Sequence, residues 1–160
     1  MKNTDGTTTT TKKNTDGSYT VTVTGEDTEA SYTVSKDAAT LDTISGAEAT
    51  VKIPDTITDS SGNSYKVTAI AAGAAKGNTK IAKVVIGKNI TTIGKNAFKG
   101  ASKLKTVLIK GSVSSVGKNA FKAINKKAVI KIDASKKSYK KIKEKIIKSG
   151  TAKTVTYKRV

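Results

Sequence analysis

The sequence contains no cysteine and no histidine. Without these residues the chain cannot build a Cys/His zinc site, a thiol nucleophile or a Ser-His-Asp triad. Its acidic residues also show no spacing typical of a catalytic carboxylate pair or a calcium loop. The sequence therefore predicts a protein that is not an enzyme, with no catalytic, cofactor-binding or metal-ligating residue and no cofactor. The lack of cysteine is compatible with both a secreted and a cytosolic protein.

Large apolar residues are also scarce. The chain has no tryptophan, aromatic residues make up 4% of it, and the apolar fraction is 36%. This composition excludes a large aromatic core and favours a thin core of isoleucine, valine and alanine from short strands. No apolar run approaches the roughly 20 residues that span a bilayer. Met1 leads straight into a polar tract with no signal peptide, so we expect an exported protein to carry its signal and anchor outside this chain.

Acidic residues are nearly absent from the second part of the chain. Residues 1–65 contain 5 Lys and 10 Asp/Glu, a net charge of −5, whereas residues 66–160 contain 25 Lys/Arg and 2 Asp/Glu, a net charge of +23. Together they give the total of +18. Such an asymmetry indicates two regions with different partners.

Residues 1–17 have low complexity. They contain five consecutive threonines at 7–11 and the tetrapeptide Asn-Thr-Asp-Gly twice, at 3–6 and 14–17. No residue here could fill a core, so the composition predicts a flexible, threonine-rich tether.

Residues 18–66 follow a different pattern and predict a small β region that leads into an N-terminal cap. Residues 18–24 and 30–35 alternate with period two and are rich in β-branched side chains, which favours a hairpin or two adjacent strands. A further strand at about 49–53 ends at Pro54, the only proline. Residues 59–63 predict a turn, and Asp55 and Asp59 are expected to serve as turn-forming residues.

Residues 67–132 are three tandem copies of a 23-residue repeat. Equivalent apolar residues recur at this interval, and the string Gly-Lys-Asn-Ala-Phe-Lys occurs verbatim at 94–99 and 117–122. The clearest equivalent sets are Ile70, Ile93 and Val116, and Val84, Val107 and Ile130. A 23-residue unit cannot bury its own apolar face, so neighbouring copies must stack and share one core.

Each copy predicts a short strand near its end, at 84–86, 107–109 and 130–132, and an extended piece near its start. Ala-Phe should lie on a single helical turn between them, with Phe98 directly above Phe121. Ala75 at the equivalent place predicts a thinner first copy, and Lys127 replaces an apolar residue in the third.

Residues 133–160 predict a C-terminal cap made of a helix and a strand. Residues 135–148 form an amphipathic pattern with Ser135 as N-cap and Gly150 as stop. Tyr139, Ile142, Ile146 and Ile147 are expected on one face, and a final strand at 154–157 should follow. The apolar stripe is narrow and lacks Trp and Phe, so capping is favoured over membrane binding.

The motif Ile-x-x-Ile-Gly-x-x-Ala-Phe-x-Gly-x-x-x-Leu-x-x-Val-x-Ile at 90–109 resembles the BspA-like class of leucine-rich repeats. The resemblance implies a mainly β fold with short helical turns: a short leucine-rich-repeat solenoid over 67–132, with a C-terminal capping helix and a small β N-terminal region. It also implies an extracellular or cell-surface bacterial protein that acts in adhesion or binding, without catalytic residues.

The candidate ligand face consists of strand residues expected to alternate with the buried ones. These are Lys83, Val85, Thr106, Leu108, Lys110, Val129 and Lys131. Leu108 and Val129 should form a small apolar patch suited to contact with a protein or polysaccharide ligand. The alternative for these positions is an ordinary solvated sheet face.

Three functions remain open from the sequence. The leading one is adhesion or ligand binding at a bacterial surface, and the second is a structural spacer that presents a neighbouring domain. The third is a basic module that binds an acidic glycan, teichoic acid or nucleic acid. A single arginine, Arg159, and the lack of an aromatic stacking platform argue against nucleic acid.

Overall fold

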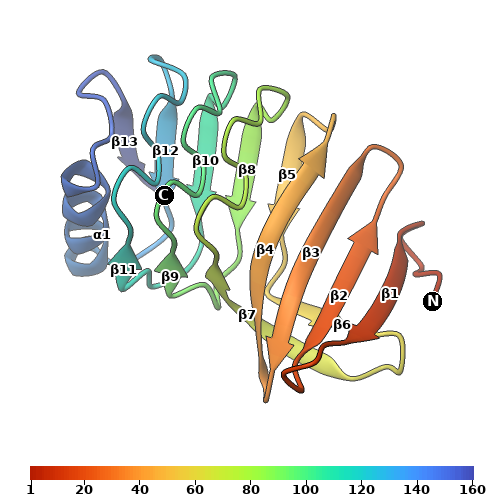
Figure 1. The fold of residues 1–160 in the computed structure, drawn as a ribbon. Helices are drawn as coiled ribbons and strands as arrows, with labels where there is room; N and C mark the ends of the chain where they lie inside the picture. Colours follow the sequence, from red (N-terminus) through yellow and green to blue (C-terminus); the bar gives the residue numbers. More distant parts are fainter.

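The computed structural model describes residues 1–160, which form two β-sheets and one helix. The first sheet contains β1 (Thr8–Lys13), β2 (Tyr19–Thr24), β3 (Thr28–Ser35), β4 (Ala38–Gly46), β7 (Ser64–Ile70), β9 (Thr92–Ile93) and β11 (Ser115–Val116) in that order, with β6 (Thr56–Thr58) paired to β7. The second sheet has the order β13 (Thr156–Arg159), β12 (Val129–Ile132), β10 (Thr106–Ile109), β8 (Lys83–Ile86) and β5 (Thr50–Ile53). Figure 1 shows the long N-terminal strands at one end of the molecule and helix α1 (Lys136–Lys148) at the other.

The N-terminal part is an antiparallel meander of β1, β2, β3 and β4. The predicted tether over 1–17 is therefore wrong: β1 pairs with β2 along its whole length, and Thr9 is 2% exposed. β-Branched threonines suit a half-buried strand once a partner strand is present. The strand at 38–46, which the sequence pattern did not reveal, pairs in parallel with β7 and so links the meander to the repeats.

The two Asn-Thr-Asp-Gly segments form turns of the same construction. In the first, the amide of Asn3 donates to Thr7 O (2.7 Å) and Gly6 has φ 85°. In the second, Asn14 donates to Ser18 O (2.8 Å) and Gly17 also has φ 85°. Glycine adopts this left-handed conformation without a steric cost, which is why the motif closes a turn twice.

The expected turn at 59–63 is confirmed. Asp59 caps it through four hydrogen bonds to its carboxylate, from Ser61 N (2.9 Å), Asn63 N (2.9 Å), Asn63 Nδ2 (3.0 Å) and Tyr65 Oη (3.0 Å). These bonds, led by the one from the Asn63 side chain, hold the pKa of Asp59 below its usual value. Asp55 joins the turn before β6 to the second sheet, because its Oδ1 accepts from Lys88 N (2.6 Å).

The 23-residue interval becomes the register of parallel strands. In the second sheet Val84, Val107 and Ile130 are direct neighbours, and all three are fully buried. In the first sheet Ile70 pairs with Ile93, and Thr92–Ile93 pair with Ser115–Val116. The strands expected at 84–86, 107–109 and 130–132 are present, each beginning one residue earlier.

The segment between the strands of each repeat is not the expected single helical turn. Lys99 N donates to Asn96 O (3.1 Å) and Ala101 N to Phe98 O (3.2 Å), but Asn96 has φ 58°. This left-handed residue interrupts any helix and produces consecutive tight turns. Asn119 has φ 61° at the equivalent place in the third repeat.

The third repeat departs from the pattern as expected at Lys127, which is exposed. Ile124 stands where the second repeat has Ala101, and it is 5% exposed. The larger side chain at 124 therefore supplies apolar volume to the end of the core that Lys127 leaves unfilled.

Helix α1 begins after Ser135, whose Oγ accepts from Ser138 N (3.3 Å), as expected for an N-cap. Ile142 and Ile146 are buried, but Ile147 is 48% exposed, so its predicted place on the apolar face is wrong. At 100° per residue Ile147 lies too far round the helix from Ile142 to share its contacts. The last strand lies at 156–159, two residues later than expected. No helix is both long and apolar enough to cross a membrane.

One continuous core joins all these parts. It contains 34 buried residues that run from Val21 in β2 to Val155 before β13. The N-terminal meander and the repeats therefore share their apolar interior, and each stabilises the other.

Candidate binding face

The second sheet presents a regular outer face. Its five strands are parallel and in register, so side chains at equivalent positions form straight rows across the sheet. One outer row is Thr50, Lys83, Thr106, Val129 and Thr156, and the other is Lys52, Val85, Leu108, Lys131 and Lys158. The alternate row between them points inward, with Val51, Val84, Val107 and Ile130 buried.

Six of the seven predicted face residues lie in these two outer rows, and the structure thus brings them together. Lys110 directly follows the last residue of β10 and is exposed. Lys83 is exposed as expected. The other five are half-buried because neighbouring strands stand only about 4.8 Å apart and cover part of each side chain.

The centre of this face is apolar and its margins are basic. Val85 and Leu108 are direct neighbours in one row, and Val129 lies diagonally beside Leu108. Lysines surround this patch at 52, 83, 131 and 158. An apolar centre with a charged rim is the usual composition of a protein contact surface.

Sequence reasoning missed the two ends of the rows, namely Thr50 and Lys52 on β5 and Thr156 and Lys158 on β13. These strands pair with β8 and β12, yet they lie 33 and 27 residues from their partners rather than 23. The alternation within 49–53 predicted the strand β5, but the 23-residue period did not predict that β5 or β13 belongs to the outer face.

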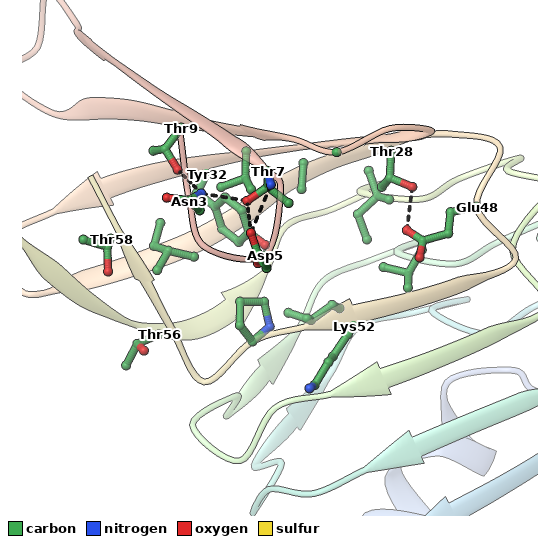
Figure 2. Close-up of a pocket in the computed structure, with 18 of the residues that line it drawn as sticks. Asn3, Asp5, Thr7, Thr9, Thr28, Tyr32, Glu48, Lys52, Thr56 and Thr58 are labelled. Atoms are coloured by element: carbon green, nitrogen blue, oxygen red, sulfur yellow. Dashed lines mark hydrogen bonds between the residues drawn. The ribbon is translucent and has the colours of Figure 1, made fainter. Parts of the chain in front are cut away.

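A hollow of about 510 Å³ lies between the inner side of the N-terminal meander and the β5–β6 segment. Figure 2 shows its polar lining from Asn3, Asp5, Thr7, Thr28 and Glu48. Sequence reasoning did not find this hollow, because part of its wall comes from the segment expected to be a tether, namely Asn3, Asp5, Thr7 and Thr9.

Several polar groups of the hollow are bonded to one another. Asn3 Nδ2 donates to Thr7 Oγ1 (2.7 Å), and Thr28 Oγ1 donates to Glu48 Oε2 (2.8 Å). Asp5 accepts from the side chain and amide of Thr7, and these bonds lower the pKa of its carboxyl. Burial raises the pKa of Tyr32 above its usual value.

Stacked short parallel strands, joined by tight turns around a strip of isoleucine, valine and leucine, define a leucine-rich repeat protein. A family model described as "BspA type Leucine rich repeat region (6 copies)" matches residues 68–157. The chain belongs to this BspA type family, in agreement with the resemblance of its repeat motif.

Solved structures share the fold. A leucine rich cell surface protein from Faecalibacterium prausnitzii is 23% identical with a TM-score of 0.58, and the match covers 71% of this chain and 32% of that one. A leucine-rich repeat protein from Bacteroides ovatus is 19% identical with a TM-score of 0.50, covering 69% of this chain and 37% of that one. The chain thus spans about a third of the length of each of these two proteins. No curated protein matches it.

Proposed function

We propose that this chain is a non-enzymatic binding module of a bacterial surface or secreted protein, and that it contacts a protein or glycan through the outer face of the second sheet. The observation that carries this proposal is the apolar patch of Val85, Leu108 and Val129 inside a rim of lysines. Stacked repeats offer such a face without a catalytic site, because all their buried residues serve the shared core.

The rest of the chain supports the face. The repeats act as a short solenoid, and α1 with β13 acts as its C-terminal cap. Lys145 Nζ on α1 donates to Ser114 O (2.7 Å) beside β11, and Ile142 and Ile146 are buried at that end of the core. The meander of β1–β4 extends the first sheet at the opposite end. The cap at one end and the meander at the other both cover apolar surface that the terminal repeats would otherwise expose.

The experiment is a plate assay with purified collagen and neutral dextran as immobilised probes, since neither carries a chain of acidic sugars. Replacing Val85→Glu and Leu108→Glu together puts two charges at the centre of the patch and should abolish retention by either probe. The matched control, Thr10→Glu with Ser45→Glu, places the same charges on exposed strand positions of the first sheet. It should bind as the parent chain does.

Two outcomes would contradict the proposal. Equal loss in the control and the patch variant would mean that net charge, not the face, governs retention. No retention of the parent chain on any probe would favour the spacer role, in which the module only presents a neighbouring domain.

A further inference from the structure

The turns of the three repeats form a third stack, separate from the two sheets. We call the turn segments 72–77, 95–100 and 118–123 the turn ridge. Six backbone hydrogen bonds of 2.7–3.0 Å tie each turn to the next: Gly73 N to Lys95 O, Ala75 N to Ala97 O, Gly77 N to Lys99 O, Asn96 N to Lys118 O, Phe98 N to Ala120 O and Gly100 N to Lys122 O. The turns are therefore held in register as firmly as strands are.

This register stacks lysines in a straight line. Lys76, Lys99 and Lys122 occupy equivalent positions on neighbouring turns, and we call them the lysine column. Lys95 and Lys118 form a second, shorter column on the same turns. Neighbouring turns stand about 4.8 Å apart, the spacing of hydrogen-bonded strands.

These charges have no partner in the protein. The single ion pair of the structure joins Lys88 to Asp55 (3.5 Å), away from the ridge. The two acidic residues of 66–160 are Asp133 after β12 and Glu144 on α1. Lys76, Lys95, Lys118 and Lys122 are exposed and Lys99 is half-buried. The turn segments that carry them contain no Asp or Glu, so the positive charges of the ridge repel one another. A line of anionic groups would relieve this repulsion.

We propose that the turn ridge binds a linear acidic polysaccharide with one carboxylate on each sugar residue. This site is distinct from the outer face of the second sheet. Each hexuronic acid residue of such a chain carries one carboxylate, and the flexible four-carbon stems of the lysines let their ammonium groups reach carboxylates that successive sugars turn to different sides.

Other polyanions fit the ridge less well. Stacking of single-stranded bases needs exposed aromatic rings, whereas Phe98 and Phe121 are fully buried. An anionic membrane surface would gain no apolar insertion, because the ridge exposes no large apolar side chain.

The test measures binding of oligogalacturonates of defined length by the whole chain in calorimetry. Affinity should rise from the monomer to the trimer, because each added carboxylate can pair with a further lysine of the column. The lysine-column variant carries Lys76→Gln, Lys99→Gln and Lys122→Gln, and it should bind the trimer about tenfold more weakly than the parent chain. The slope of log K against log salt concentration should fall by about 2, since each lost contact contributes roughly 0.7.

A matched control removes the same charge elsewhere. The control variant carries Lys136→Gln, Lys140→Gln and Lys153→Gln, three exposed positions outside the ridge. Its affinity for the trimer should stay within about twofold of that of the parent chain. Equal melting temperatures of the two variants would show that both are folded.

Three results would overturn the inference: equal weakening in both variants, no increase of affinity with length, or tighter binding of a thymidine oligonucleotide or a phosphatidylserine vesicle than of the trimer. The Val85→Glu, Leu108→Glu variant should retain trimer binding, and the lysine-column variant should retain collagen and dextran binding. The two proposals can therefore fail independently.

Discussion

The rings of Phe98 and Phe121 stack face to face, with centroids 5.3 Å apart and planes inclined by 8°. Both residues are 0% exposed and stand at the same position of consecutive repeats. The stack is a direct product of the 23-residue period, because the backbone bond from Phe98 N to Ala120 O (2.8 Å) fixes the two turns in register.

Phe98→Ala should lower the free energy of unfolding by about 3–5 kcal/mol, through lost burial and the cavity left under the Phe121 ring. In a chain of this size that corresponds to roughly 6–20 °C in melting temperature. Lys95→Ala on the same turn, where the side chain is exposed, should change the melting temperature little. An unchanged melting temperature in the Phe98 variant would count against the stacked core.

Gly94→Ala should be destabilising by about 3 kcal/mol because of overpacking against backbone. A Cβ at Gly94 would stand 2.5 Å from the carbonyl carbon of Ala71 and 2.5 Å from the amide nitrogen of Ala72 in the preceding repeat. Gly25 provides the control, since its Cβ would meet nothing closer than Thr28 O at 3.5 Å. Denaturant unfolding of both variants checks the prediction, and similar midpoints for the two would refute it.

Ile146→Ala should cost about 2–5 kcal/mol, whereas Ile147→Ala should cost little. The two isoleucines are adjacent in α1, but Ile146 is 0% exposed and Ile147 is 48% exposed. Thermal unfolding followed by circular dichroism distinguishes them. Comparable losses in both variants would mean that α1 packs by a different face.

Asp59 should make the protein sensitive to acid. Its pKa is lowered in the folded chain, so its hydrogen bonds stabilise the fold above the unfolded value of about 3.9 and this stability is lost as pH falls through the lower folded value. Asp59→Asn should therefore lower the urea midpoint at pH 7, and the difference from the parent should shrink below about pH 4.

Asp37→Asn, which removes an exposed carboxylate in the β3–β4 turn, serves as the matched control variant. It should follow the acid response of the parent chain. A difference between the Asp59 variant and the parent that stays constant from pH 7 to pH 2 would contradict the role of the charged carboxylate.

The sequence by itself determined the repeats and their register. Since each copy repeats the same apolar positions, every copy must offer the same face to its neighbour, and Val84, Val107 and Ile130 had to align. The helix and its N-cap at Ser135 were also readable, because both depend on residues within a few positions of one another. The six face residues on β8, β10 and β12 followed from strand alternation alone.

Only the tertiary structure decided the rest. β1 is a strand because it pairs with β2. The low-complexity run of threonines does not predict this pairing. The ends of the outer rows depend on β5 and β13, which join the sheet across intervals unlike the period. Because Asn96 is left-handed, the expected helical turn is replaced by a tight turn. The backbone of this turn forms hydrogen bonds to the equivalent turns of the neighbouring repeats. These features rest on contacts between distant segments, whose energies no local pattern encodes.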